Sequence, residues 1–507
     1  MNVFNQDQLR NLSKNKFDLS HERKLSCKWG DLVPIYLQEV LPGDSFRVDT
    51  EIMVRMAPML APVMHRVDVY THWFYVPNRI VWDNWEAFIK AEDQTSPVVH
   101  PSVQWTDAFK ANFAKGTLAD YFGIPTPATP ATVVQPSNFN SLPFKGYQLI
   151  YNEYYRDQDL QPEIDIRKSV DGVDNSSNLM QLRKRAWAKD YFTSARPRAQ
   201  KGEPVAFGNY SEDWLLSADG TVLPSGSNLQ TINPGVDTAD VQTASGKQVL
   251  PNILISDLRR AEAVQKYLER LQRSGNRYKE YLASNWGVIS SDARIDRPEY
   301  LGGGKTPIAI SETLQTSADG ATGTTTPQGN PAGHGIGVAI EHGFKESFEE
   351  HGFVFGIMSI VPKRAYQNGK DRMWNRFNKF DYYTPDLALI GEQDVLNKEI
   401  WFDEVNQAST SQNSTFGYQQ RYAEYKYKCD SVHGDMRDDL NFWHLGTEFT
   451  SQPNLNSDFI SVKPEASYDN LNRIFAVTSG PDPFWIQLYH KVDAIRPILY
   501  ESVPQLG

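Results

Sequence analysis

The clearest pattern in the chain is a two-residue alternation of apolar and polar side chains that follows a Pro-Gly turn at residues 41–44. Through residues 46–56 the apolar side chains keep one parity, and charged side chains occupy most of the other. Successive side chains of a strand point to opposite faces, so this pattern predicts a strand with one buried face. A second predicted strand, residues 67–76, is apolar on much of both faces and stops at Pro77.

Comparable strands recur far downstream. Residues 336–340 alternate, residues 352–361 are almost continuously apolar, and residues 484–498 again keep their apolar side chains on one parity. Predicted strands therefore gather toward both ends of the chain, with a long stretch between them. We expect one all-β sandwich that is closed by its first and last segments and carries insertions in its loops, rather than a row of separate domains.

The middle of the chain differs in kind. Residues 203–250 and 315–335 are rich in Gly, Ser, Thr and other loop-forming residues, which predicts long insertions at the surface. Between them, residues 256–283 repeat apolar side chains at three- and four-residue spacing behind Ser256, a suitable N-cap, with an interruption at Gly275. This stretch is predicted to be a helix within the insertion region.

The amino-acid composition indicates how large a core the chain can form and how its charge is balanced. Hydrophobic residues make up 40% of the 507 residues and aromatic residues 12%, which predicts a globular protein with a substantial core. So many rings suit either large interfaces between proteins or a large β-core. The formal net charge of −11 does not indicate bulk coating of nucleic acid, although local basic patches remain allowed.

The two cysteines, Cys27 and Cys429, are too few and too far apart for a disulfide framework or a zinc site. No apolar run approaches the ~18 residues of a membrane span, and the first residues lack the pattern of a signal peptide. We expect a protein with reduced thiols that is made in a cytoplasm and does not insert into a membrane.

Residues 302–306, Gly-Gly-Gly-Lys-Thr, look like the end of a phosphate-binding loop. The full motif needs a further glycine where Glu299 stands, so a glycine-rich turn is the better interpretation. Neither a His-Glu-x-x-His pair, a Cys/His cluster nor a Gly-x-Ser-x-Gly elbow occurs in the sequence. No catalytic residue, cofactor or metal ion is predicted.

The remaining candidate chemistry lies in two segments, 183–201 and 363–379, where basic residues surround aromatic ones. Such a mixture can hold a single strand, because cations meet phosphates and rings stack on bases. It also suits an exposed face or a contact between subunits, since arginine and aromatic residues mark protein interfaces. The candidate DNA-contact residues are Arg183, Lys184, Arg185, Trp187, Lys189, Arg372, Trp374 and Arg376. Residues 1–40, which we expect to form an N-terminal arm, contain a weaker basic group.

Nine blocks of the sequence stand in a characteristic order, at residues 15–21, 39–44, 72–79, 82–85, 190–193, 197–202, 274–278, 297–303 and 416–425. Taken in order, these blocks resemble the major capsid proteins of microviruses, particularly those of the gokushovirus branch. Any single block is weak, but the ordered set is highly specific and extends over about residues 15 to 500. The insertion 203–250 has no counterpart and falls where this family varies.

The resemblance implies an eight-stranded antiparallel jelly-roll β-sandwich with long loop and helical insertions, in which residues 1–507 form a single capsid domain. Sixty copies would form an icosahedral shell around circular single-stranded DNA, with basic and aromatic residues of the inner face on the genome. The resemblance also implies that 203–250 forms part of a protrusion at the threefold axes that faces the host. The host-attachment candidates in it are Tyr210, Trp214, Asp219 and Asn228.

The expected partners are other copies of the chain, viral single-stranded DNA and a host surface receptor. We also expect an assembly scaffold and other virion proteins as partners. Such virion proteins include a minor spike or pilot protein or a small DNA-binding protein. The protein is expected in the virion, after assembly in the cytoplasm of a bacterial host.

Two other classes of protein stay open on the residues alone. An enzyme built on a β-sandwich, such as a depolymerase, predicts a cleft with two carboxylates ~5–9.5 Å apart. A spike that binds a carbohydrate or a receptor predicts a separable binding domain. The ordered blocks favour the shell subunit over both.

Overall fold

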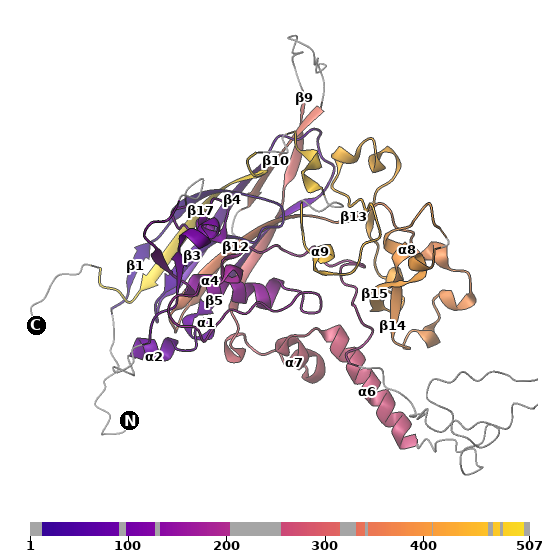
Figure 1. Ribbon diagram of the computed structural model, residues 1–507, viewed down its shortest axis with the longest axis horizontal. Helices are drawn as coiled ribbons and strands as arrows, with labels where there is room; N and C mark the ends of the chain where they lie inside the picture. Colours follow the sequence, from indigo (N-terminus) through magenta and orange to yellow (C-terminus); the bar gives the residue numbers. More distant parts are fainter. Residues whose placement is uncertain are drawn as a thin grey trace, which may run out of the picture. The chain divides into compact units, whose positions relative to one another are not determined.

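Two antiparallel sheets form the framework of the chain (Figure 1). The structure is a computed structural model that describes residues 13–90, 98–126, 132–202, 255–314, 331–339, 343–407, 409–464, 470–476 and 480–500. The chain divides into two units. The first comprises Met1–Pro197 and Val288–Gly507, and it contains both sheets; the second comprises Arg198–Gly287.

The larger sheet has seven strands in the order β1-β17-β4-β10-β9, with β11 also paired to β4 and β2 also paired to β17. The smaller sheet has four strands in the order β3-β12-β5-β8. The strands of the larger sheet are β1 (Asn15–Asp18), β2 (His21–Cys27), β4 (Ser45–Met56), β9 (Ala309–Leu314), β10 (Pro331–Ala339), β11 (Phe344–Ser347) and β17 (Phe484–Arg496). Those of the smaller sheet are β3 (Val33–Val40), β5 (Val67–Pro77), β8 (Glu299–Pro307) and β12 (Gly352–Pro362).

The last strand of the chain pairs with one of the first. Strands β17 and β4 run antiparallel from Phe484 opposite Met56 to Ile495 opposite Ser45. The structure therefore contains the expected pairing between the first and last segments, and the all-β, antiparallel character of the framework is confirmed.

The core between the two sheets follows from the alternation in the sequence. Every second residue of β4 is buried, as the pattern predicts. Ile52 and Val54 of this strand pack in one cluster with Leu488 of β17, Val69 of β5 and Ile360 of β12. Since this cluster draws on strands of both sheets, burial of its apolar side chains holds the sheets face to face.

The opposite face of the smaller sheet is also covered. Helix α4 (Leu142–Ile150) contributes Phe144 and Tyr147 to a second cluster that includes Phe74 of β5 and Phe355 of β12. A strand buried on both faces needs apolar side chains at both parities. This explains why residues 67–76 and 352–361 do not alternate, and why all residues of β12 are buried.

Shorter elements make up the connections. The other α-helices are α1 (Asn78–Val81), α2 (Trp85–Lys90), α3 (Leu118–Tyr121), α5 (Ser177–Met180), α6 (Ile255–Ser274), α7 (Tyr278–Trp286), α8 (Asn397–Ile400) and α9 (Ser457–Ile460). Three small sheets pair β6 (Ser102–Trp105) with β7 (Ser137–Asn140), β13 (Ala365–Tyr366) with β16 (Asp430–Ser431), and β14 (Glu392–Leu396) with β15 (Thr415–Gln420). The single-turn helices that matter below are η5 (Arg372–Asn375) and η6 (Lys379–Asp381).

The structure differs from the sequence-based expectations at three places. Residues 15–40, expected in an arm, contain β1, β2 and β3, because side chains such as Trp29 and Ile35 are buried between the sheets. The glycine-rich turn expected at 302–306 is wrong, since these residues lie in β8 and pair with β5. The helix expected over 256–283 consists of α6 and α7, which end and begin on either side of Gly275, whose φ is +94°. The insertion 203–250 lies outside the described residues.

Candidate nucleic-acid interface

The two basic and aromatic segments, 183–201 and 363–379, meet in the folded chain. The guanidinium of Arg364 lies over the ring of Trp187, 5.0 Å from its centroid. The rings of Phe192 and Tyr366 pack edge to face, with centroids 4.9 Å apart. Tyr366 also donates a hydrogen bond to the carboxylate of Asp190 (2.7 Å). The segments thus share one apolar core, which linear spacing did not show.

In the first segment two of the four predicted cations form ion pairs with carboxylates of the chain. Lys184 forms an ion pair with Asp31 (2.6 Å), and Lys189 forms one with Asp157 (2.8 Å). The indole of Trp187 is buried, so it cannot stack on a base. Three of the eight candidates therefore serve the fold in the isolated chain.

Arg183 and Arg185 differ, because their hydrogen bonds go to neutral groups. Arg183 donates to the side chain of Gln148 (2.8 Å) and to the carbonyl of Asn178 (2.7 Å). Arg185 lies 3.8 Å from the ring centroid of Tyr70 and donates to the Ser359 hydroxyl (2.9 Å). Burial lowers the pKa of both guanidinium groups, and within the described residues neither group forms an ion pair with a carboxylate.

In the second segment Arg372 and Arg376 are tied to buried carboxylates. Arg372 pairs with Glu399 (2.9 Å), and Arg376 pairs with Glu424 (3.0 Å). Burial raises the pKa of Glu399, and Arg372 opposes that shift. By contrast, the ring of Trp374 on η5 is 64% exposed and available to a partner.

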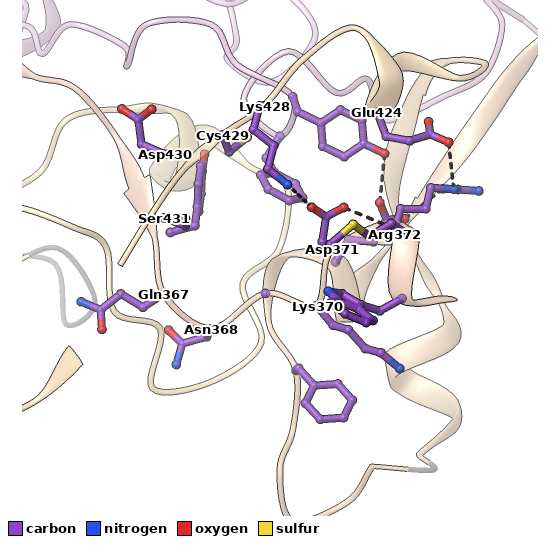
Figure 2. A pocket seen from close by; sticks show the side chains of 18 of the residues that line it. Gln367, Asn368, Lys370, Asp371, Arg372, Glu424, Lys428, Cys429, Asp430 and Ser431 are labelled. Carbon is purple, nitrogen blue, oxygen red and sulfur yellow. Dashed lines mark hydrogen bonds and ion pairs between the residues drawn. The ribbon is translucent and has the colours of Figure 1, made fainter. Parts of the chain in front are cut away.

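Next to these ion pairs lies a cavity of about 670 Å³, within the range of small-molecule sites. Its wall is formed by Tyr191 and Phe192, by the loop 366–374, by residues around 399–404 and by residues 424–437 (Figure 2). Figure 2 shows Lys428 directed at Asp371 and Glu424 at Arg372. Most carboxylates of the wall are thus already neutralised.

The cavity contains no activated nucleophile. Burial raises the pKa of the Cys429 thiol to about 12, which keeps it protonated at neutral pH. Burial likewise raises the pKa of the Tyr191 and Tyr366 phenols. Over the described part of the chain, no cluster of three His, Cys, Asp or Glu side chains is placed to hold a metal ion.

Sequence reasoning missed part of the cavity wall. Gln367, Asn368 and Phe402 were not among the candidates, and Lys370 was noticed only as one cation of the segment. Amide side chains carry no sequence pattern, and the approach of Lys370 to Phe402 depends on the fold. The host-attachment candidates Tyr210, Trp214, Asp219 and Asn228 lie outside the described residues.

The two facing antiparallel sheets define a protein of the β-sandwich class with long connections between its strands. In addition, none of the helices described has the length and apolar character needed to cross a membrane. The chain matches the family described as capsid protein (F protein) over residues 8–506 and belongs to that family.

Relatives match the chain over nearly its whole length. The capsid protein VP1 of Chlamydia phage 1 is 32% identical over 100% of this chain and 98% of its own. VP1 of Bdellovibrio phage phiMH2K is 35% identical (97% and 95% of the two chains), and VP1 of Spiroplasma virus 4 is 30% identical (98% and 96%). The resemblance to microvirus capsid proteins is confirmed.

The protein is therefore a structural capsid protein and a component of the virion. Membership of the family implies assembly with copies of itself into a shell, and it identifies the protein as a structural protein, not an enzyme. The interpretation as a β-sandwich depolymerase is set aside on this ground.

Proposed function

We propose that the chain is the major subunit of a small icosahedral shell, sixty copies of which enclose circular single-stranded DNA, and that its framework is an eight-stranded jelly roll. The observation that carries the proposal is the strand order. One sheet contains β2-β17-β4-β10 and the other β3-β12-β5-β8, so the chain crosses repeatedly between the sheets, as the two Greek keys of a jelly roll do. In this description β1, β9 and β11 extend the larger sheet.

The long connections would supply the contacts between subunits. Residues 78–298 join β5 to β8, and residues 363–483 join β12 to β17. The second connection exposes a cluster of large apolar side chains, which we call the apolar surface. Its members are Phe377, Phe380, Tyr382, Tyr383, Leu389 and Ile390. Exposed apolar side chains gathered within so short a stretch of the sequence fit burial against a second copy.

The genome would contact the two basic and aromatic segments. Among the eight candidates, Arg183, Arg185 and Trp374 come first. Within the described residues no carboxylate pairs with either arginine, and the ring of Trp374 is exposed. Lys184, Lys189, Arg372 and Arg376 would act through the fold that their ion pairs stabilise, and the buried Trp187 through packing.

The insertion 203–250 would form the host-facing protrusion at the threefold axes, with Tyr210, Trp214, Asp219 and Asn228 as attachment candidates. This part of the proposal rests on the composition of the insertion and on the family resemblance. Assembly would take place in the bacterial cytoplasm, with a scaffold and minor virion proteins as helpers. The two free thiols, Cys27 and Cys429, suit a reducing compartment.

The mass of the particle tests the proposal. Protein purified from virus, or produced together with its assembly partners, is analysed by negative-stain microscopy and by sedimentation. We expect uniform round particles with the mass of sixty 57.6 kDa subunits, in addition to any DNA. A stable monomer or dimer under these conditions would refute the shell.

A further inference from the structure

The outer face of the larger sheet carries large apolar side chains in place of polar ones. Trp485 and Tyr489 of β17 are 43% and 39% exposed, and Val338 of β10 is 59% exposed. Met53, on the strand β4 between them, is half-buried. A sheet with one solvated face normally presents polar side chains to water. Exposed apolar side chains gathered on one face therefore indicate a surface for a partner.

The strand register shows that these side chains are neighbours, since β17, β4 and β10 lie side by side (Figure 1). Residues directly opposite each other on antiparallel strands point to the same face and lie about 5 Å apart. The opposite pairs are Met53 with Val338, Arg55 with Trp485, and Glu51 with Tyr489. We call these six residues the sheet patch.

Two charges of opposite sign flank the centre of the sheet patch. Arg55 and Glu51 are exposed, and within the described residues neither forms an ion pair. They stand four residues apart on β4, with Met53 between them, which places them about 13 Å apart. At that separation the two charges do not meet within one chain. Each therefore lacks a counter-charge that a partner can supply.

The charges next to the sheet patch lie beside opposite charges. Lys24 and Glu22 of β2 pair with each other (3.1 Å), and so do Arg47 and Asp49 of β4 (3.1 Å). Lys491 of β17 stands opposite Asp49. The free carboxylate of the sheet patch would repel phosphates, so a protein suits this face better than a nucleic acid.

The sheet patch is complementary to a second copy of itself. In a twofold contact, residues i and j of one copy meet residues j and i of the other. When two such faces meet with their β4 strands antiparallel and crossing at Met53, Arg55 of each copy lies over Glu51 of the other. The same rotation brings Trp485 over Tyr489. With parallel strands like charges would meet, so the charge pattern selects the antiparallel arrangement.

We propose that the sheet patch is a twofold contact between two copies of the chain, with their larger sheets packed face to face. Sheets packed in this way keep their strand directions within about 30° of each other and lie about 10 Å apart, which lets facing side chains touch. Aromatic residues, Met and Arg are also the residues enriched in protein interfaces. The inference rests on the proposed icosahedral shell, whose symmetry includes twofold axes, and the contact is separate from the apolar surface.

Charge reversal tests the pairing of Arg55 with Glu51. Arg55→Glu and Glu51→Arg each place two pairs of like charges in every contact, and each should lower the yield of sedimenting particles roughly tenfold or more. The double variant Glu51→Arg/Arg55→Glu restores opposite charges in exchanged order and should assemble like the parent. Co-production of the two single variants should also restore assembly, because a mixed contact brings two glutamates against two arginines.

Thermal unfolding of each isolated subunit should change little, because both side chains are exposed. Lys491→Glu is the matched control, since Lys491 is exposed on the same face outside the sheet patch, and it should assemble normally. Normal assembly by both single variants would overturn the inference and leave the shell intact. So would a double variant that does not recover, because the genome or another virion protein would then cover the face. A parent chain without particles would refute the shell instead.

A short thiol cross-linker tests the position of the twofold axis. In the proposed contact Val338 faces its own copy across the gap of about 10 Å between the sheets. A bis-maleimide of that span should therefore join Val338→Cys subunits into dimers within particles, as seen on a denaturing gel. Lys491→Cys should give no dimers, since its two copies would stand about 26 Å apart. The parent chain controls for Cys27 and Cys429, and dimers formed equally by both variants or by neither would overturn the contact.

Discussion

His490 shows how one buried side chain can make the stability of the chain depend on pH. Its imidazole accepts a hydrogen bond from Thr50 at Nδ1 (2.9 Å) and donates one from Nε2 to the carbonyl of Ile35 (3.1 Å). Burial, together with the nearby His21, lowers its pKa to about 3. The folded chain therefore holds this imidazole neutral over most of the acid range.

Acid should destabilise the chain through His490. In the unfolded chain a histidine has a pKa of about 6.5. Between about pH 6.5 and pH 3 the unfolded state therefore binds a proton that the folded state does not, and the free energy of unfolding falls as pH falls. Over the whole window the effect is roughly 5 kcal/mol, of which about 3 kcal/mol is lost between pH 6.5 and pH 4. Urea titrations from pH 7 to pH 4 should show a shallower fall for His490→Gln than for the parent, and no such change for the exposed control His433→Gln. Parallel curves for all three would contradict this account.

Asp44 and Arg496 form a largely buried ion pair between the two ends of the chain. Nε and Nη2 of Arg496 both lie within 3.2 Å of the carboxylate, which also accepts the backbone N–H of Leu41 (2.8 Å). The side chain of Asp44 is fully buried. Loss of one partner of such a pair leaves the other charge buried and unmatched.

Asp44→Asn should accordingly lower the free energy of unfolding by about 3 kcal/mol. Asp49→Asn, in β4 five residues further along, breaks an exposed pair with Arg47 and should change stability little. Chemical denaturation of both variants provides the comparison. If both variants lose the same free energy of unfolding, the buried ion pair stabilises the chain no more than the exposed pair does.

At the scale of elements, the strands that could be predicted are those in which the pattern of apolar side chains shows which faces are buried. Strand β4 alternates because one of its faces is buried, and β12 is apolar throughout because both of its faces are. Strand β8 has no such pattern of apolar side chains, since its three central residues are glycines. Its identity as a strand depends on pairing with β5, a contact more than 200 residues away in sequence. The cavity shares this property, because its wall joins four separated segments.

Gly303 in β8 illustrates what the glycines do. A Cβ at this position would lie 2.4 Å from the carbonyl oxygen of Thr71 and 2.7 Å from the hydroxyl of Tyr300. The backbones of β5 and β8 could not keep their register around it. Gly303→Ala should therefore lower the free energy of unfolding by about 2–3 kcal/mol.

Gly337→Ala, in β10, is the matched control. There a Cβ would meet only the side chain of Ile308, at 3.2 Å, and that side chain can shift. The expected loss is below about 1 kcal/mol. Denaturant unfolding of the two variants decides the matter, since equal losses would mean that close packing of β8 on β5 does not explain its glycines.

At the scale of the whole molecule, membership of a capsid family requires that much of the exposed surface is buried in the shell. The apolar surface is the best candidate for such a contact. Phe377 is 80% exposed and Leu389 is 95% exposed, and four further members stand in the same connection. Charges at these positions would have to be buried unpaired in an assembled particle, at a cost that many symmetric contacts multiply.

The double variant Phe377→Asp/Leu389→Asp should therefore fold normally and fail to assemble. Because both side chains are exposed in the isolated chain, thermal unfolding of the subunit should change little, whereas the yield of sedimenting particles should fall at least tenfold. Val134→Asp supplies the control, since Val134 is 89% exposed and belongs to a different connection. Particles formed in normal yield by the double variant would remove the apolar surface from the shell contacts and leave its exposure to be explained by another partner.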